Sequence, residues 1–356
     1  MDREKLLQLF RPSRIILPIS IGIVAWTLMG YRSLDVNQLL SIDWTWYAGL
    51  WVLMALLMMV IRDLAYMYRI KVLTSDALTW KQSFQVIMLW EFASAITPSI
   101  VGGSAVAVYI VHKELNNVGK STAIVMASSL LDELFYVLMV PILYLFISQD
   151  ELFSIQQDSA LQAITHDYGL YLFGFGYLFI LTYSVIILYA LFYNPRVIKW
   201  TFIKVFSLPF FRKWRTAAAK AGDDLIIASK EIKGKRKRFW AKAGIATFVS
   251  WTARFWVVNF LILVPLGVGI PFSDHLLIYG RQLLMWVIML VSPTPGSAGF
   301  AEQAFIIFLG EFTQEGLIAL LAIMWRLISY VPYLFIGLVV LSPWIKRVYS
   351  KDKPTG

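Results

Sequence analysis

Apolar residues gather in six uninterrupted segments of the chain, and polar or charged residues separate them. A transmembrane helix needs about 20 apolar residues to cross the hydrocarbon core of a bilayer. With 59% hydrophobic and 15% charged residues, the chain has the composition of a membrane protein with several spans. The predicted spans cover residues 15–31, 44–61, 122–148, 169–193, 242–267 and 317–342.

Two further apolar stretches, residues 83–111 and 275–309, are interrupted near the middle. The interruptions read Thr97-Pro98-Ser99 with Gly102-Gly103-Ser104, and Ser292-Pro293-Thr294-Pro295-Gly296-Ser297-Ala298-Gly299. Proline removes a backbone donor and glycine adds backbone freedom, so a helix breaks at both places. Open backbone at membrane depth is tolerated only where it is packed in protein or lines a wet cavity. We therefore predict two re-entrant broken-helix hairpins whose tips form a binding site.

The loop charges predict the topology, because short cytoplasmic loops collect Lys and Arg. The N-terminus, the loop at 62–82 and the C-terminus are basic, whereas residues 149–168 hold four acidic residues and no Lys or Arg. We therefore place both termini in the cytoplasm and residues 149–168 outside. Hairpin 83–111 is then predicted to enter from the cytoplasmic face and hairpin 275–309 from the opposite face.

The two interrupted stretches repeat one pattern at a fixed distance along the chain. Thr97-Pro98 and Thr294-Pro295 are each followed, four residues after the proline, by a glycine, and the offset between them is 197 residues. The same offset moves the spans that begin at 44 and 122 to 241 and 319, where spans are also predicted. Inverted repeats with broken helices are a transporter architecture. We divide one transmembrane domain, residues 1–356, into a first repeat at 10–148 and a second repeat at 169–345.

A basic segment lies between the two hairpins. Residues 194–242 hold 14 of the 32 Lys and Arg residues and only three acidic ones, so this segment accounts for the net charge of +10. We predict a basic cytoplasmic linker at 194–241. The pattern from Arg196 to Phe206 also fits an amphipathic helix that attracts anionic lipid. The charge therefore points to a membrane surface as partner and not to nucleic acid.

Several kinds of chemistry find no support in the sequence. There is no cysteine, and His112, His166 and His275 are too widely separated to form a metal-ligand motif. Gly119-Lys120-Ser121-Thr122 is similar to the end of a nucleotide-binding loop, but Glu114 stands where that loop needs its first glycine. We predict no nucleotide, no metal and no other cofactor.

Seven ionisable residues fall inside the predicted spans or hairpins. A charge at the centre of a bilayer costs about 3 kcal/mol or more unless it is paired or wet, so these residues should face the protein interior. Ion pairing that only holds the hairpins in place is the alternative, and both roles can coexist. The helix N-termini after the two breaks offer N–H groups to a phosphate or carboxylate. The seven residues are Glu91, Asp132, Glu133, Arg254, Arg281, Glu302 and Arg326.

The interrupted motifs resemble the signatures of a known family. Pro293-Thr294-Pro295-Gly296-x-x-Gly299-x-x-Glu302, preceded by Thr97-Pro98-Ser99-x-x-Gly102-Gly103, is similar to those of the bacterial lysylphosphatidylglycerol synthase/flippase transmembrane family, over about residues 10–345. The resemblance implies a multi-pass lipid translocase of the cytoplasmic (inner) membrane. Its relatives move aminoacylated phosphatidylglycerol or other polar lipids between leaflets.

The chain departs from the family pattern in two ways. Members that synthesise the lipid carry a soluble aminoacyl-transfer domain after the spans, and this chain ends about 14 residues beyond its last predicted span, so synthesis is not expected. Leu131-Asp132-Glu133-Leu134-Phe135 stands where an arginine is expected. The substrate or its coupling is therefore expected to differ.

Our leading hypothesis is a flippase in which a polar head group sits between the hairpins while the repeats alternate access. The partners are membrane lipids, anionic or zwitterionic, and a homo-oligomer is left open. We predict that Glu91, Asp132, Glu133, Arg254 and Arg326 act in gating or charge compensation. The predicted substrate-binding residues are Thr97, Pro98, Ser99, Gly102, Gly103, Ser104, Arg281, Thr294, Pro295, Gly296, Ser297, Gly299 and Glu302.

Two alternatives come from other classes of protein. An intramembrane enzyme with Asp132 and Glu133 as acid and base would modify a lipid-linked substrate. Adjacent carboxylates on a helix point about 100° apart, however, so they are not expected to face one site. The second alternative is an assembly partner in the membrane that uses the 194–242 segment.

Overall fold

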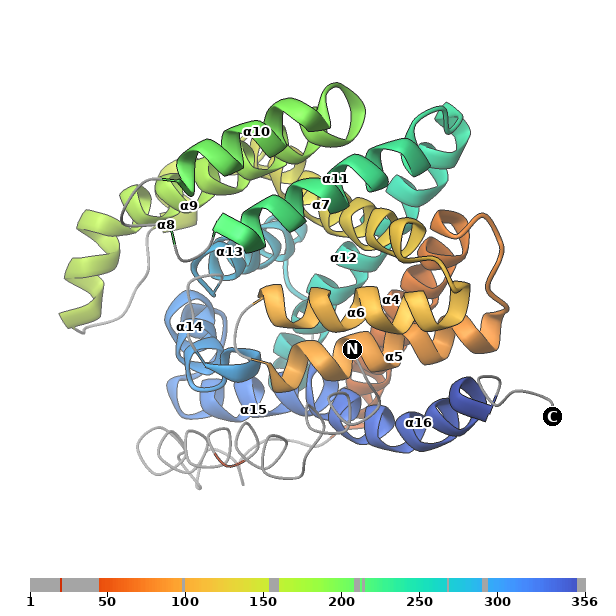
Figure 1. Cartoon of the computed structure of the whole chain (residues 1–356). Coiled ribbons are helices and arrows are strands. Elements are labelled where there is room, and N and C mark those ends of the chain that lie inside the picture. The colour runs from red at the N-terminus through yellow and green to blue at the C-terminus, as the bar shows by residue number, and fades with distance from the viewer. Residues whose placement is uncertain are drawn as a thin grey trace.

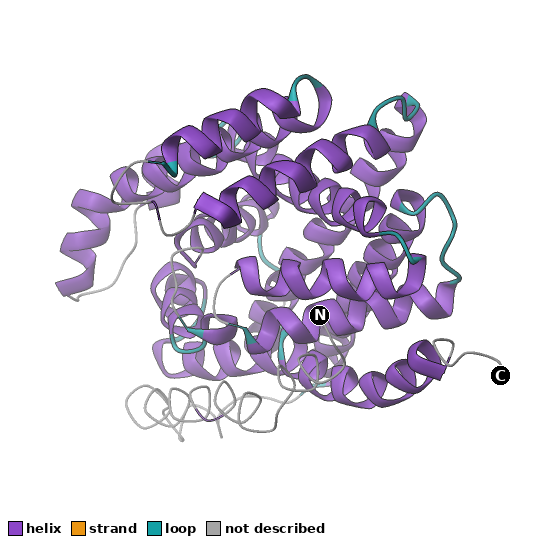
Figure 2. Cartoon of the chain, viewed as in Figure 1, coloured by secondary structure: helices purple, strands orange, loops and turns teal. Residues whose placement is uncertain are grey.

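The structure is a computed structural model that describes residues 45–97, 100–153, 160–207, 215–267, 269–289 and 294–350, with the single residues 20 and 212. The described residues form helices joined by loops and contain no strand (Figure 2). The α-helices are α4 (Trp46–Leu73), α5 (Trp80–Ile96), α6 (Ile100–Leu115), α7 (Val118–Leu143), α8 (Gln149–Phe153), α9 (Ala160–Phe192), α10 (Pro195–Val205), α11 (Arg215–Ile232), α12 (Lys237–Leu266), α13 (Phe272–Met289), α14 (Phe300–Leu309), α15 (Ile318–Ser329) and α16 (Val331–Ser350). Short 3-10 turns are η2 (Pro295–Ser297), η3 (Gly310–Phe312) and η4 (Glu315–Leu317).

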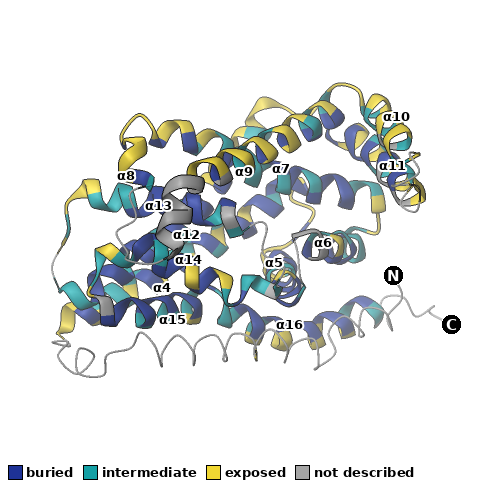
Figure 3. Ribbon diagram, turned by 90° about the vertical axis from the view of Figure 1, so that its left-hand side faces the viewer, coloured by how far each residue is buried: buried dark blue, intermediate teal, exposed yellow. Residues whose placement is uncertain are grey.

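Five of the described helical segments are long and apolar enough to cross a membrane. Their outward faces carry exposed apolar side chains, such as Leu138 and Val339, which are 61% and 74% exposed (Figure 3). The prediction of an all-α, multi-pass membrane protein is therefore confirmed. The predicted span at 15–31 lies outside the described residues. The five segments are Trp46–Leu73, Val118–Leu143, Phe173–Phe192, Lys237–Leu266 and Ile318–Tyr349.

The first interrupted stretch forms a helical hairpin, with α5 and α6 packed side by side (Figure 1). Helix α5 begins at a capping box, in which the Thr79 hydroxyl accepts from the backbone N–H of Gln82 and the Gln82 side chain accepts from the N–H of Thr79. The helix ends at Thr97, directly before Pro98, as expected because proline disfavours helical backbone in the residue before it. The two arms of the hairpin, α5 and α6, approach each other closely. A Cβ atom on Gly103 of α6 would lie 2.3 Å from the Ser94 hydroxyl oxygen of α5.

Gly103→Ala is expected to push the two arms of this hairpin apart. The added methyl group meets the Ser94 side chain and its backbone at 3.0 Å, so one arm must shift. Overpacking of this kind costs about 1–3 kcal/mol, and thermal unfolding in detergent measures it. Ser94→Gly in the same chain should restore part of the loss, whereas an unchanged unfolding midpoint in Gly103→Ala would contradict the close contact.

The second interrupted stretch forms α13 and α14, which also pack against each other. The backbone turns through η2, and three of the four turn positions 296–299 need unusual backbone: Gly296 at φ 56°, Ser297 at φ 55° and Gly299 at φ 84°. Glycine tolerates this left-handed region, and a serine there is uncommon. A Cβ atom on Gly296 would lie 2.3 Å from the Tyr330 ring, so this glycine is also needed for close packing.

The two halves of the chain repeat one order of elements: a long helix, a broken hairpin and a second long helix. Helix α4 packs along α12 in the most extensive contact between described helices, and this pair joins the halves. Adding 197 to the first residues of α4, α5, α6 and α7 gives 243, 277, 297 and 315, which fall within or a few residues from α12, α13, α14 and α15. The inverted relation of the halves, their domain bounds and the re-entrance of the hairpins stay predictions.

One boundary of the predicted spans was wrong. Helix α4 continues to Leu73, so residues 62–73 are helical and not part of a loop. Charge counting assigned them to a loop because it treats every arginine as solvated, but Arg62 and Arg69 are buried and paired. The predicted span at 317–342 falls almost entirely within the described segment Ile318–Tyr349, in which α15 and α16 meet at Tyr330.

The basic segment between the halves is more than a solvated linker. Helix α10 covers the stretch predicted as an amphipathic helix, and α11 follows it. The two helices pack against each other, and α11 also contacts α7 and α9 (Figure 1).

Candidate functional site

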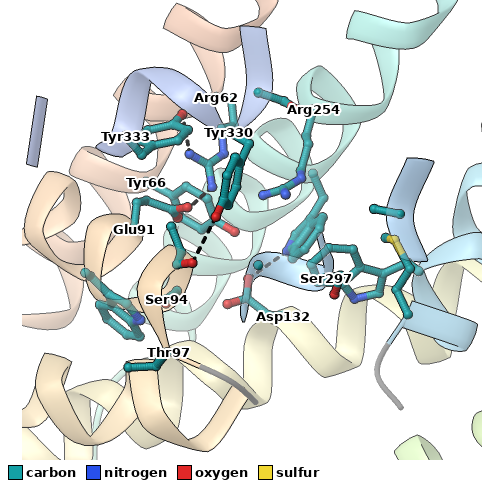
Figure 4. Close-up of a pocket in the computed structure, with 18 of the residues that line it drawn as sticks. Arg62, Tyr66, Glu91, Ser94, Thr97, Asp132, Arg254, Ser297, Tyr330 and Tyr333 are labelled. Carbon is teal, nitrogen blue, oxygen red and sulfur yellow. Dashed lines mark hydrogen bonds and ion pairs between the residues drawn. The ribbon is translucent and has the colours of Figure 1, made fainter. Parts of the chain in front are cut away.

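A cavity of about 270 Å³ lies where the two halves meet, and both hairpin tips contribute to its wall. The residues labelled in Figure 4 come from α4, α5 and its C-cap Thr97, α7, α12, η2 and α16, and Tyr330 lies between α15 and α16. Its volume is at the lower end of the range of about 300–1,000 Å³ for small-molecule sites. The lining residues are Arg62, Tyr66, Trp90, Glu91, Ser94, Ala95, Thr97, Ser104, Ser129, Asp132, Glu133, Tyr136, Trp251, Arg254, Trp286, Met289, Thr294, Gly296, Ser297, Ala301, Trp325, Arg326, Ser329, Tyr330 and Tyr333.

The structure brings together ten of the residues predicted from the sequence. They line the cavity: Thr97, Ser104, Thr294, Gly296, Ser297, Glu91, Asp132, Glu133, Arg254 and Arg326. Another four predicted residues do not line it: Gly103, Gly299, Arg281 and Glu302. For Gly102 and Pro295 the structure describes only the backbone. Pro98 and Ser99 lie outside the described residues.

Arg62 of α4 holds a polar cluster in one wall of the cavity. Its guanidinium donates to Asp63 at 2.8 Å and to Glu91 at 2.6 Å, so two carboxylates share one cation. It also donates to the Tyr333 hydroxyl at 2.6 Å, and that hydroxyl donates to Asp63 at 2.8 Å. Tyr66 stacks on the guanidinium, with its ring centre 4.6 Å away. The cluster therefore joins α4, α5 and α16.

A second ion pair lies one to two turns further along α4. Arg69 binds Asp132 of α7 with both guanidinium nitrogens, at 2.5 and 3.1 Å. The Trp251 indole N–H of α12 donates to the same carboxylate at 2.7 Å. Asp132 is thus held by three donors from two helices, a good reason for its charge to be stable at this depth.

Arg254 lies differently from these paired arginines. Its guanidinium is 5.4 Å from the ring centre of Trp251 and 5.1 Å from that of Trp286, and it forms no ion pair with any described carboxylate. Figure 4 shows it turned toward the same space as Arg62, Glu91 and Asp132. Stacking on indole faces orients a cation while leaving its N–H donors available. The cavity therefore offers a positioned arginine to an anion.

Two polar groups in the wall close to Arg254 also lack partners within the described part of the chain. Glu133 lines the cavity without a hydrogen bond or ion pair. The Tyr136 hydroxyl is buried and unpaired, although the ring stacks on Trp286. A buried hydroxyl without a partner costs about 1–3 kcal/mol, so a ligand or water that bonds to it gains by doing so.

The prediction that Asp132 and Glu133 do not face one site was wrong, since both line this cavity. An angle of about 100° between successive side chains still lets both contact a wide space.

Glu302 and Arg326 brace the turn of the second hairpin. The Glu302 carboxylate accepts from Arg326 at 2.7 Å and from the backbone N–H of Gly299 at 2.7 Å, and it is fully buried. Arg326 also donates to the Gly296 carbonyl at 2.8 Å. The central carbon of its guanidinium lies 4.1 Å from the centre of the Tyr330 ring. The Glu302 carboxylate therefore occupies the N-terminus of α14, where the sequence predicted a substrate anion.

Arg281 is placed away from the cavity. Its guanidinium pairs with Glu311 at 2.8 Å and donates to the carbonyls of Phe308 at 3.1 Å and Glu151 at 2.9 Å. These contacts tie α13 to the end of α14 and to α8. A head-group role for Arg281 stays a prediction, and its geometry is that of a buried structural ion pair.

Sequence reasoning missed Arg62, Tyr66, Arg69 and Tyr333. The first three lie at intervals of four and three residues, which places them on one helix face. Extending the helical pattern of the second span past residue 61 would have revealed that face. No such local signal marks Tyr333, because it meets Arg62 only through packing of α16 on α4. Within the described residues, no three His, Asp or Glu side chains gather as a metal site.

Comparison with known proteins supports one assignment. The chain is 27% identical over 325 residues to a UPF0104 membrane protein of Archaeoglobus fulgidus, which covers 86% of this chain and 90% of the relative. No solved structure matches the chain significantly. The family model described as the lysylphosphatidylglycerol synthase TM region matches residues 15–337. The chain therefore belongs to the lysylphosphatidylglycerol synthase transmembrane-region family.

Proposed function

We propose that this protein is a lipid transporter that moves a phospholipid with a polar, anionic head group between the leaflets of the membrane. The central cavity receives the head group, and the acyl chains stay in the bilayer. The family assignment fits a function in membrane lipid metabolism. The proposal places the protein in the cytoplasmic membrane with both termini inside.

One observation carries the proposal: the cavity holds an arginine that has no carboxylate partner among the described residues. A guanidinium binds a phosphate through two parallel N–H donors, and it is strongest where water is excluded. Arg254 has this chemistry, and Trp251 and Trp286 fix its orientation. The lipid phosphate is the anion that such a site in a membrane protein would meet.

The position of the cavity supports transport. Thr97 and Ser104 of the first hairpin and Thr294 and Ser297 of the second all line it. A site between two similar halves can be exposed to either leaflet when one half moves against the other. We propose that the hairpins are re-entrant and that their tips form the gates on the two sides of Arg254.

The arrangement supports a transporter over an intramembrane enzyme. General acid–base chemistry needs two groups that can exchange protons with a substrate. Asp132 is fully engaged by Arg69 and Trp251, which leaves Glu133 as the one unpaired carboxylate in the described cavity wall. Mass spectrometry of lipids from cells that express the protein tests the alternative, because an enzyme would generate a new lipid.

Arg254→Ala is expected to slow the movement of fluorescent phosphatidylglycerol between leaflets of proteoliposomes. Loss of a charged hydrogen bond costs about 1.5–3 kcal/mol, which corresponds to roughly 10- to 100-fold in rate. Chemical quenching of the outer leaflet follows the movement. Arg254→Lys keeps the charge but loses the bidentate geometry, and it should retain an intermediate rate.

Lys230→Ala provides the matched control, because Lys230 is an exposed basic residue of α11 outside the cavity wall. Its rate should equal that of the unmodified protein. The proposal fails if Arg254→Ala and Lys230→Ala move phosphatidylglycerol equally fast, or if the unmodified protein moves no phospholipid in a panel of anionic and zwitterionic head groups.

A further inference from the structure

The Arg62 cluster carries more negative than positive charge. Arg62 is fully buried and contacts two carboxylates, Asp63 at 2.8 Å and Glu91 at 2.6 Å. With all three groups ionised, the cluster has a net charge of −1. An unbalanced charge at membrane depth is expensive, whereas one added proton brings the cluster to neutrality. Like charges that share a site take up protons as a pair.

Among the described residues, no second cation forms an ion pair with Asp63 or Glu91. Tyr66 of α4 covers the guanidinium with its ring, and Tyr333 of α16 bridges Arg62 and Asp63 with its hydroxyl. From α12, the Ser250 hydroxyl contacts only the Arg62 carbonyl. The next charges are Arg69 and Asp132, which neutralise each other, and Arg254 and Glu133, which face the same cavity.

Glu91 is the member of the cluster that lines the cavity and links two helices. Its side chain is 24% exposed, and its one polar contact among the described residues crosses from α5 to Arg62 on α4. Asp63 sits on the same helix as Arg62 and also accepts from Tyr333. A proton on Glu91 therefore removes an ion pair between helices, while Arg62 keeps Asp63 as its counter-ion.

We propose that Asp63 and Glu91 form a proton-binding site that couples lipid movement to proton movement. This inference rests on the transport function proposed above. A proton from the water of the cavity adds to a carboxylate oxygen of Glu91, and the ion pair that ties the first hairpin to α4 is lost. The hairpin arm then moves against α4. Release of the proton to the other side restores the pair.

Infrared difference spectroscopy tests the proton site without any transport. Reconstituted protein is taken from high to low pH, and the C=O stretch of protonated carboxyl groups is recorded. Glu91→Gln, which keeps the size and the acceptor oxygen, is expected to remove one carboxyl from the band. Asp150→Asn, which changes an exposed acid of α8 away from the cluster, serves as the control for loss of a carboxyl elsewhere.

Asp63→Asn supplies a second variant with the same charge change, so a folding defect in Glu91→Gln does not prevent the test. Because the two carboxylates share the proton, Asp63→Asn should lower the pH at which the remaining group takes it up. The proton site is overturned if Glu91→Gln and Asp63→Asn change the carboxyl band no more than Asp150→Asn does.

The coupling is tested with a pH gradient across proteoliposomes that contain fluorescent phosphatidylglycerol. The gradient is expected to shift the steady-state distribution of the lipid between leaflets in the unmodified protein and to leave it unchanged in Glu91→Gln. The coupling is overturned if Glu91→Gln changes the infrared carboxyl band but the pH gradient does not change the distribution of the lipid in the unmodified protein. Absence of lipid movement under all conditions would instead count against the transport function, and the infrared result would stand separately.

Discussion

Replacing Arg326 with leucine is expected to lower the free energy of unfolding by about 3–5 kcal/mol. Glu302, its partner at 2.7 Å, is fully buried and would lose the cation that neutralises it there. The same change removes the donor to the Gly296 carbonyl, so the turn of the second hairpin loses its anchor. Chemical unfolding in detergent micelles, followed by tryptophan fluorescence, measures the loss.

A second substitution separates the lost charge balance from lost packing. Glu302→Gln in the Arg326→Leu chain removes the buried negative charge and keeps an acceptor for the Gly299 N–H. The double variant is expected to recover about 1–3 kcal/mol relative to Arg326→Leu alone. Lys230→Leu, at an exposed position, should change the stability by no more than about 0.5 kcal/mol. If the double variant were less stable than Arg326→Leu, the charge of Glu302 would not be the cause.

Arg62→Leu is expected to destabilise the protein by about 3 kcal/mol, at the lower end of the range for broken buried ion pairs. Two carboxylates lose their cation together, yet both side chains are about a quarter exposed, and Glu91 lines the cavity. Water therefore offsets part of their repulsion. The contact between α4, α5 and α16 should loosen, and hydrogen exchange at the cavity-facing turns of these helices should increase.

Neutralising one carboxylate of the cluster should restore part of the stability that Arg62→Leu removes. Adding Glu91→Gln leaves one carboxylate, which still accepts from Tyr333, and stability should rise relative to Arg62→Leu alone. Low pH should have the same effect in the single variant, because protonation neutralises the same groups. If neither Glu91→Gln nor low pH changed the stability of the Arg62→Leu chain, Arg62 would contribute by packing and not by charge.

The sequence by itself determined the class of protein and the places where its helices break. Apolar runs long enough to span a bilayer are a local property of the chain, and so is the inability of Pro98 to continue α5. The ten predicted residues that line the cavity were found on one ground: charges and open backbone at membrane depth must face the interior.

Which of these groups are paired depends on the tertiary structure. Arg62 and Tyr333 are 271 residues apart, and Arg69 and Asp132 are 63 apart, so no local pattern links them. A basic residue in a loop and a buried, paired arginine near the end of a helix look the same in the sequence, which is why α4 was predicted to end too early. Within the described residues, helix packing places counter-ions beside Arg62, Arg69 and Arg326, whereas Arg254 lies beside two indole rings and no carboxylate pairs with it. That difference in surroundings, and not the residue type, is the reason that we propose Arg254 as the cation that binds a ligand.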